Sequence, residues 1–250
     1  MWGGVWEIRH FDEVDSTNTY VREQARLGAR AGLVVVADYQ TSGRGRLERR
    51  WESPRGANLL VSILLRPACD GTRVHLCTGA VALAAADACQ EVAGVDAVLK
   101  WPNDLLVGEA KLAGVLAEAE FERGSLAAVV VGIGVNVAWP GPPESGGTCL
   151  DEVGSAERPV DRHVLLDRLL SALAPRCASL EDPDGRRALA GEVRRRCATL
   201  GRTVRVVLPG GEFTGRATTI DDAGHLVVDT GAGTRRVAAG DVVHLRSAPG

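Results

Sequence analysis

The chain has 250 residues, of which 45% are hydrophobic and 24% charged, and its formal net charge is −3. This composition supplies enough apolar residues for one or two packed domains and excludes a disordered chain. The slightly acidic balance argues against a broad nucleic-acid-binding face, because such a face is normally basic. The N-terminal stretch lacks the pattern of a signal peptide, and the longest unbroken apolar runs, such as 80–86 and 127–131, fall far short of a membrane span. We therefore expect a cytoplasmic protein that binds neither membrane nor nucleic acid.

The first part of the chain predicts helices and buried strands in alternation. A helical pattern over 19–25 follows Ser-Thr-Asn at 16–18, which offers a natural N-cap. Apolar runs at 33–39 and 58–65 predict two buried strands, with a loop rich in glycine and arginine between them. The alanine- and leucine-rich segment 74–92 then predicts a long helix packed on a sheet.

The middle of the chain continues this mixed pattern. A short strand is expected over 98–101, a hairpin over 105–119 and a strand running into a glycine-bearing turn over 126–137. After a loop rich in proline and glycine, amphipathic helices are expected over 160–173 and 186–198.

Beyond residue 200 the pattern changes to short alternating strands separated by glycine-rich turns. The five expected strands have the sequences TVRVVL, EFTGRATTI, HLVVDT, TRRVAA and DVVHLR. Such spacing is typical of a small β-barrel. The sequence thus predicts two domains, a mixed α/β body over 1–200 and a small all-β domain over 201–250.

The six cysteines are scattered, with no CxxC pair and no short spacing to a histidine. A disulfide framework or a zinc site is therefore not expected, and the thiols are interpreted as reduced and buried.

The loop GRGRLERRW at 43–51 is the first candidate functional segment. Its two glycines allow close backbone approach to a ligand, and its arginines offer bidentate donors to phosphate or carboxylate. The loop matches neither the GxxxxGK[ST] nor the GxGxxG phosphate-binding pattern. Taken alone, it is compatible with a solvated loop, a nucleic-acid contact or a site for a phosphorylated small molecule. Trp51 adds a platform on which a base can stack.

The second candidate segment is KWPNDLLVGEAKLAG, which contains Lys100 and Lys111, the only lysines among 29 basic residues. A lysine kept in a chain that otherwise uses arginine indicates a need for a compact ammonium charge. Asp104 is a candidate ligand for Mg²⁺, and Asn103 can bind a ligand or close a turn. In GIGVN, further along, two glycines precede Asn136, whose amide can read an adenine edge. Each of these segments also has an ordinary turn interpretation.

Together, the stretches DSTN, GRGRLERRW, SPRGANLLVS, KWPNDLLV, KLAGVL and GIGVNV resemble those of the biotin protein ligases. The resemblance runs from about Asp15 to the C-terminus, and GRGRxxRxW together with KWPND and KLAG is highly specific. It implies an α+β fold: a mixed sheet with flanking helices, as in class II synthetase-like biotin/lipoate ligase catalytic domains, followed by an SH3-like β-barrel. Only about fifteen residues precede DSTN, so we expect the monofunctional type without a DNA-binding domain.

The resemblance also implies roles for individual residues. The positions that match biotin contacts are Ser16, Thr17, Asn18, Gln40, Gly43, Arg44, Arg46, Lys111 and Gly114. The positions that match ATP contacts are Arg46, Arg49, Trp51, Asn103, Asn136 and Arg246. Arg44, Lys111 and Asp104 are the expected catalytic residues, with Asp104 also the expected Mg²⁺ ligand. The arginine loop is then an adenylate lid, expected to be mobile until a ligand binds.

The implied reaction has two steps, activation of biotin by ATP as biotinyl-AMP and transfer to a lysine of a biotin carboxyl carrier protein. The runner-up interpretation is a lipoate or octanoate ligase of the same fold, which is expected to lack GRGRxxRxW and KWPND. The resemblance leaves the oligomeric state open, with a homodimer as one option.

Overall fold

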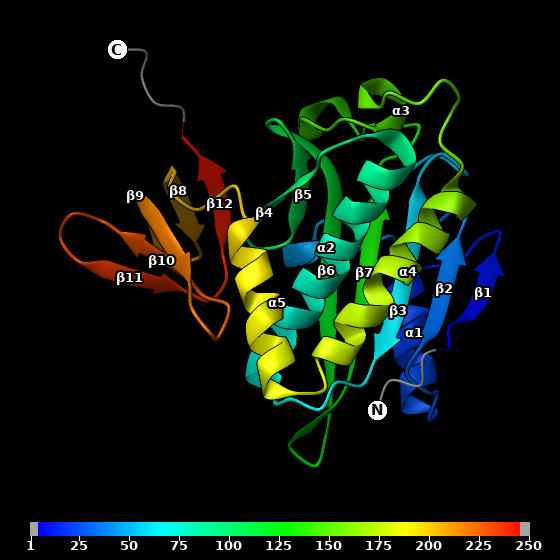
Figure 1. Ribbon diagram of the computed structural model, residues 1–250, viewed down its shortest axis with the longest axis horizontal. Coiled ribbons are helices and arrows are strands. Elements are labelled where there is room, and N and C mark those ends of the chain that lie inside the picture. The colour runs from blue at the N-terminus through cyan, green and yellow to red at the C-terminus, as the bar shows by residue number, and fades with distance from the viewer. Residues whose placement is uncertain (1–4, 246–250) are drawn as a thin grey trace.

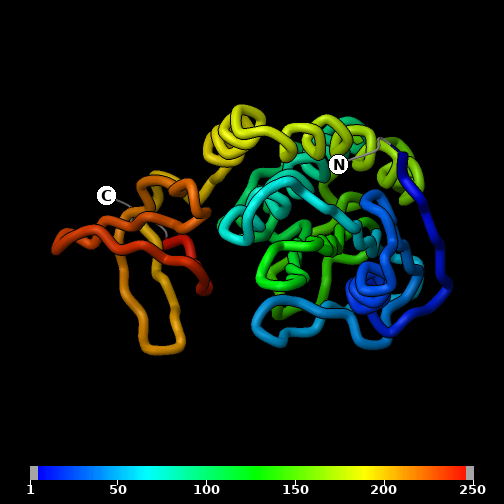
Figure 2. The backbone as a smooth tube through the Cα atoms, turned by 90° about the horizontal axis from the view of Figure 1, so that it is seen from below, coloured from blue at the N-terminus to red at the C-terminus, as the bar shows by residue number. Residues whose placement is uncertain are grey.

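The computed structural model describes residues 5–245, which form a large α/β body and a small β domain. Figure 1 shows the body as a sheet with helices packed in front of it and behind it, and the small domain beside helix α5. In Figure 2 the small domain lies to one side of the body and connects to it at the end of α5.

A seven-stranded sheet with the order β1-β2-β3-β7-β6-β5-β4 forms the body. Its strands are β1 (Glu7–Phe11), β2 (Leu33–Ala37), β3 (Leu59–Leu65), β4 (Val98–Lys100), β5 (Asp104–Val107), β6 (Ala110–Glu122) and β7 (Ser125–Val135). The β1–β2 pair is parallel, and the remaining pairs are antiparallel. The prediction of a mixed sheet is confirmed.

The helices cover the two faces of this sheet unequally (Figure 1). They are α1 (Thr17–Arg26), α2 (Val74–Ala93), α3 (Leu150–Val153), α4 (Arg162–Ser179) and α5 (Pro183–Arg195), with single 3₁₀ turns at Arg46–Glu48, Gly71–Arg73 and Pro143–Ser145. Helices α2 and α4 pack against each other and against one face, whereas α1 packs on the other face over β2, β3 and β7. The second face is therefore left open over the part of the sheet that lies beyond α1.

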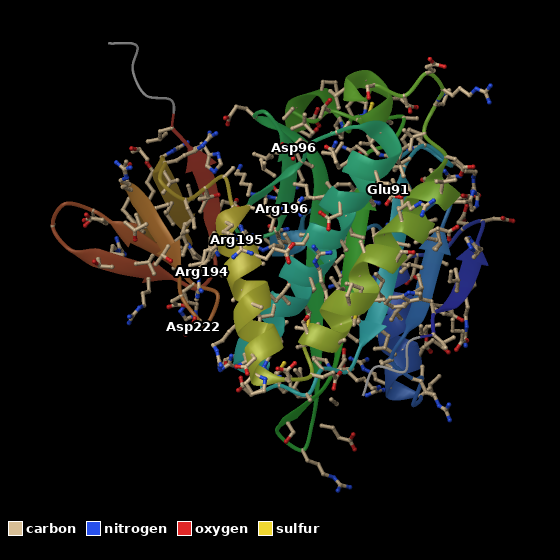
Figure 3. The ribbon with its side chains drawn as sticks, viewed as in Figure 1. Glu91, Asp96, Arg194, Arg195, Arg196 and Asp222 are labelled. Atoms are coloured by element: carbon tan, nitrogen blue, oxygen red, sulfur yellow. The ribbon has the colours of Figure 1, made fainter. Side chains whose placement is uncertain are left out.

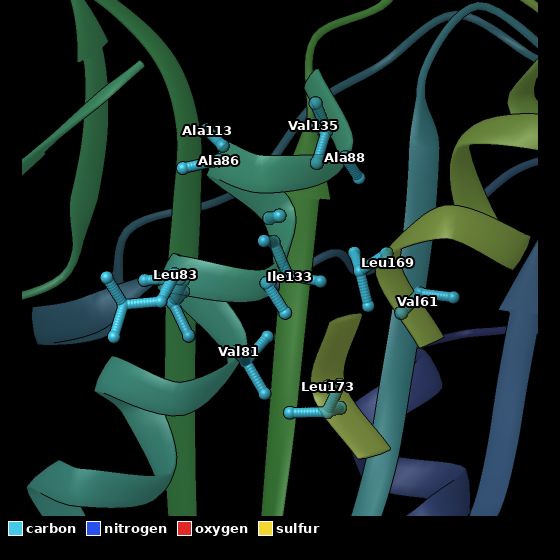
Figure 4. Close-up of a cluster of buried hydrophobic side chains, with 14 of the residues drawn as sticks. Val61, Val81, Leu83, Ala86, Ala88, Ala113, Ile133, Val135, Leu169 and Leu173 are labelled. Atoms are coloured by element: carbon cyan, nitrogen blue, oxygen red, sulfur yellow. The ribbon is translucent and has the colours of Figure 1, made fainter. Parts of the chain in front are cut away.

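Side-chain alternation along the strands builds a separate core on each face. On the face of α2 and α4, strand residues such as Val61 and Ile133 pack against helix residues such as Val81 and Leu169 (Figure 4). On the opposite face, alternate residues including Val35 pack under α1.

Helix α2 is long and apolar enough by composition to cross a membrane. However, 72% of its most apolar window is buried inside the protein. Such burial is that of a core helix packed between a sheet and other helices.

The small domain is a five-stranded antiparallel sheet with the order β11-β10-β9-β8-β12. Its strands are β8 (Thr203–Leu208), β9 (Gly211–Ile220), β10 (Leu226–Asp229), β11 (Thr234–Val237) and β12 (Asp241–His244). This arrangement agrees with the small all-β domain predicted from the strand spacing.

The small domain packs firmly against the body. Trp101, at the end of β4, is 6% exposed and belongs to the small domain's apolar cluster. Its indole N–H donates to the carbonyl oxygen of Gly224 at 3.0 Å. Figure 3 labels Arg194, at the end of α5, and Asp222, which are joined by a 2.7 Å ion pair across the same junction. The body's residues therefore complete the small domain's core.

Most predicted elements are confirmed within a few residues of their expected ends. Strand β1 and the four-residue helix α3 were not predicted from the sequence. All six cysteines are free thiols, and all but Cys69 are buried, as expected.

Candidate active site

A cavity of about 770 Å³ lies on the open part of the sheet, beyond α1. Its size is within the range of small-molecule sites. It is bounded by the start of α1, the loop 44–52, the β4–β5 corner, the loop 140–147 and the start of β12. The predicted site residues that line it are Ser16, Thr17, Asn18, Gln40, Arg44, Arg46, Arg49, Trp51, Asn103, Asp104, Lys111, Gly114 and Asn136. The structure thus gathers residues from distant segments of sequence into one space.

Glycines form the floor of the cavity, where other strand positions would carry side chains. Gly114 on β6 and Gly134 on β7 are paired across the sheet. The indole of Trp51 lies directly on both: a Cβ at Gly134 would collide with the ring, and a Cβ at Gly114 would be 2.9 Å from it. Only glycine permits this approach. The indole N–H of Trp51 is buried and has no hydrogen-bond partner among the described residues, so a ligand acceptor can be bound there.

Part of the cavity wall, at the start of α1, presents neutral hydrogen-bonding groups. Ser16 caps α1, as predicted, by accepting from the backbone N–H of Thr19 at 3.4 Å. The amide oxygen of Gln40 accepts from both the backbone N–H and the hydroxyl of Thr17, at 2.8 and 3.1 Å. Hydroxyl and amide groups held in this way suit a neutral donor–acceptor ligand group.

The arginine loop closes over the cavity as a small hairpin. Arg44 and Arg50 form an isolated antiparallel bridge, and the N–H of Trp51 donates to the carbonyl of Gly43 at 3.0 Å. Gly43 does not line the cavity, but a Cβ there would collide with the Trp51 carbonyl. Leu47 and Glu48 have φ values of 54° and 60°, a region that few non-glycine residues occupy. The structure gives the loop one defined conformation, so its mobility without ligand stays a prediction.

Each of three cations at the cavity has a carboxylate partner. The Lys111 ammonium is 2.7 Å from Asp104 Oδ1. The Arg44 guanidinium is 3.1 Å from Glu118, and Arg49 pairs with Asp241 of the small domain. These pairs hold positive charge at the place where an anionic ligand group would need it.

Arg46 connects the loop to both domains. Its guanidinium donates to the side-chain oxygen of Asn103 at 3.1 Å and to the carbonyl of Gly240 at 3.4 Å. Burial lowers the pKa of Arg46, although Asp241 and Asp104 oppose this shift. The small domain therefore forms part of the cavity wall. Arg246, the arginine predicted to reach the phosphates, lies outside the described residues.

All three predicted asparagines use amide hydrogens within the protein, and Asn103 donates to the carbonyl of Val115 at 2.8 Å. Asn18 donates to Glu118 at 2.9 Å and to the Leu116 carbonyl at 3.3 Å. Asn136 donates to the carbonyls of Pro140 and Thr148, both at 3.0 Å, and so holds the loop 140–148 in place. Their contacts with ligand stay predictions, and the structure gives all three residues a supporting role.

Within residues 5–245, no group of three or more histidine, cysteine, aspartate or glutamate side chains could hold a metal ion by itself. Asp104 nevertheless fits Mg²⁺ that arrives with a nucleotide, since such an ion commonly takes one or two protein carboxylates and the phosphates.

Sequence reasoning missed three polar residues at or beside the site. Ser62 is fully buried within the apolar run of β3. Glu118 and Asp241 are the carboxylate partners of Arg44 and Arg49. The serine in LLVSILL was a usable signal, because a hydroxyl buried in a strand needs a hydrogen-bond partner.

Comparison with known proteins agrees with this geometry. Residues 10–136 match the biotin/lipoate A/B protein ligase family, and residues 199–245 match the biotin protein ligase C terminal domain.

Relatives resemble the chain over nearly its whole length. A biotin–[acetyl-CoA-carboxylase] ligase of Mycobacterium tuberculosis is 37% identical, over 94% of this chain and 87% of that protein. One of Paracoccus denitrificans is 34% identical, over 91% of this chain and 96% of that protein. The biotin protein ligase of Aquifex aeolicus, solved with biotin and ATP, superimposes with a TM-score of 0.79 at 28% identity, covering 96% and 99% of the two chains. The chain belongs to the biotin/lipoate A/B protein ligase family and, within it, to the biotin protein ligases.

Proposed function

We propose that this protein is an ATP-dependent biotin–protein ligase, which activates biotin as biotinyl-AMP and transfers it to a lysine of a biotin carboxyl carrier protein. One observation carries the proposal. A single cavity is lined both by neutral hydroxyl and amide groups, Thr17 and Gln40, and by the cations Arg44 and Lys111. Biotin has matching chemistry, with a neutral ureido ring at one end and a carboxylate at the other.

In the first step a biotin carboxylate oxygen attacks the α-phosphorus of ATP. A new oxygen–phosphorus bond forms, the bond from that phosphorus to the bridging oxygen breaks, and pyrophosphate leaves. Both reactants are anionic, so they approach each other only where fixed positive charge offsets their repulsion. Lys111 and Arg44 supply that charge, and the cavity holds the reacting atoms in line.

In the second step the amine of the carrier lysine attacks the acyl carbon of the mixed anhydride. An amide forms, AMP leaves, and the amine loses a proton. The closed loop 43–51 keeps water from the anhydride, since water would hydrolyse it. Trp51 provides a face for adenine, and Arg46 and Arg49 provide charge near the phosphates.

Asp104, Lys111 and the phosphates of ATP together would hold the Mg²⁺–nucleotide complex, with Asp104 as the protein ligand. When bound, the ion would neutralise charge on the leaving pyrophosphate. In the structure the ammonium group of Lys111 forms an ion pair with Asp104 at 2.7 Å.

We further propose that the protein acts in the cytoplasm on a protein partner rather than on nucleic acid, and that it forms a homodimer. Within the described residues, β1 pairs only with β2, so its other edge is open to a second copy. Sedimentation with and without biotin would test the dimer.

The test of the proposed function is transfer to protein. Purified enzyme is incubated with ATP, Mg²⁺, a carrier domain and either biotin or lipoate, and the carrier is analysed by mass spectrometry. We expect biotin on one lysine of the carrier and no product with lipoate. Modification by lipoate instead would make the protein a lipoate ligase of the same fold.

A further inference from the structure

Helix α1 and strand β6 face each other through a ladder of complementary charges. Asn18, Arg22 and Arg26 are four residues apart along α1 and so lie on one face of the helix. Glu118 and Glu120 are two residues apart on β6 and so lie on one face of the sheet. Arg22 bridges the two carboxylates, at 2.8 Å to Glu118 and 2.6 Å to Glu120.

The two carboxylates of this ladder differ in one respect. Glu120 pairs with Arg22 and Arg26 only, both of α1. Glu118 pairs with Arg22 and also with Arg44, at 3.1 Å, and it accepts a hydrogen bond from Asn18 at 2.9 Å. Its side chain is only 16% exposed. Glu118 is therefore the point at which the ladder meets the arginine loop.

From Glu118 a chain of hydrogen bonds leads through the start of α1 and through β3 to Gln40 at the cavity wall. The side-chain oxygen of Asn18 accepts from Ser62 at 2.6 Å. The Ser62 and Thr17 hydroxyl oxygens are 2.7 Å apart, and the backbone N–H of Thr17 donates to Gln40 at 2.8 Å, so the two hydroxyl protons suffice for the two remaining contacts. All the links between Glu118 and Gln40 are short, and Ser62, Thr17 and Asn18 are buried. Such a network fixes its members in one arrangement.

The charge balance leaves the site positive. Three arginines, Arg22, Arg26 and Arg44, face two carboxylates, Glu118 and Glu120, so one positive charge remains for a ligand. Because Arg22 already offsets Glu118, the carboxylate holds Arg44 in place without cancelling its charge. The Arg44 side chain is 45% exposed and would otherwise adopt many rotamers.

We propose that Glu118 is a positioning residue for biotin binding, which holds the Arg44 guanidinium in its ligand-binding arrangement. This inference rests on the proposed function, and Glu118 itself is not expected to touch the reacting atoms. Fixing Arg44 before the ligand arrives reduces the entropy that binding would otherwise cost.

The experiment compares Glu118→Gln with Glu120→Gln by calorimetric titration of each variant with biotin. Both substitutions keep the side-chain volume, and both remove one charge from the same ladder, so both should lower the melting temperature to a similar extent. We expect biotin to bind Glu118→Gln about 5- to 20-fold more weakly, as for a lost charged hydrogen bond. Biotin should bind Glu120→Gln within about twofold of wild type, because Glu120 does not contact Arg44.

A double-mutant cycle with Arg44→Ala separates positioning from general damage. If Glu118 acts through Arg44, adding Glu118→Gln to Arg44→Ala should change the biotin dissociation constant by less than about twofold. The inference about Glu118 would be overturned, with the proposed function left standing, by either of two results. One is a biotin dissociation constant for Glu118→Gln equal to that of wild type. The other is the same weakening of biotin binding by Glu118→Gln with and without Arg44→Ala. Wild-type protein that binds no biotin would overturn the proposed function and this inference with it.

Discussion

Replacing Lys111 by alanine should abolish most of the adenylation activity while leaving the fold intact. The side chain is one-third exposed and forms a single 2.7 Å ion pair with Asp104. Ion pairs with this exposure contribute roughly 0.2–1 kcal/mol to stability. For a chain of this size we therefore expect the melting temperature to fall by no more than about 2–4 °C.

The effect on the reaction should be far larger, because Lys111 acts where negative charges meet. Removing one preorganised donor at such a position costs about 10²- to 10³-fold in kcat, or roughly 2.7–4 kcal/mol. Lys111→Arg should recover little of this. A planar guanidinium presents its charge as a fork of donors and does not reproduce the compact ammonium that lies 2.7 Å from Asp104.

The assay is single-turnover formation of biotinyl-AMP from biotin and ATP, with the melting temperature measured on the same samples. Arg205→Ala is the matched control, because Arg205 forms a comparable ion pair with Glu212 in the small domain, at 3.1 Å. It should lose a similar amount of stability and no activity. Lys111→Ala with a rate within about threefold of wild type would refute the reasoning that fixed charge at this position drives the step.

Three further predictions concern the loop and the small domain. Arg46→Gly removes the loop's bonds to Asn103 and to Gly240 of the small domain, so biotinyl-AMP should escape and label lysines of bystander proteins. Labelling confined to the carrier, measured by avidin blot, would contradict this. Asp241→Asn frees Arg49 for phosphate and should lower the apparent KM for ATP roughly two- to fivefold, the worth of one exposed ion pair; an unchanged or higher KM would count against it. Burial, followed by neighbouring cations such as Arg202, lowers the pKa of His244. The folded protein therefore favours the neutral imidazole. The free energy of unfolding should be highest above about pH 6.5 and should fall as the pH drops through the lowered pKa of His244, because the unfolded chain binds the proton more readily. As the pH is lowered from 8 to 5, the melting temperature should fall less for His244→Gln than for wild type. An identical fall in both proteins would refute this.

Local sequence patterns predicted most of the elements because they depend on local physics. The cap at Ser16, the apolar runs of β2 and β3 and the period of α2 are each readable within a dozen residues. Strand β1 has an exposed, charged sequence, EIRHF, and is specified only by its parallel pairing with β2. No local pattern reports such a pairing.

The candidate site was predictable as a set of residues, but its supporting contacts were not. The roles given to Lys111, Arg44 and Trp51 came from motif order, and the structure places all three at one cavity. Glu118 and Asp241 lie 74 and 192 positions from the arginines they hold, so no spacing rule connects them. Trp101 reads as the end of a strand in the body, yet its indole completes the core of the other domain.

The central claim is tested most directly by biotin-dependent exchange of labelled pyrophosphate into ATP, measured with no carrier protein present. Exchange requires reversible formation of biotinyl-AMP and pyrophosphate in the cavity, and it requires no later step. We predict exchange that depends on biotin, is not supported by lipoate or octanoate and is lost in Lys111→Ala. Exchange that proceeds without biotin, or that only lipoate supports, would contradict the account.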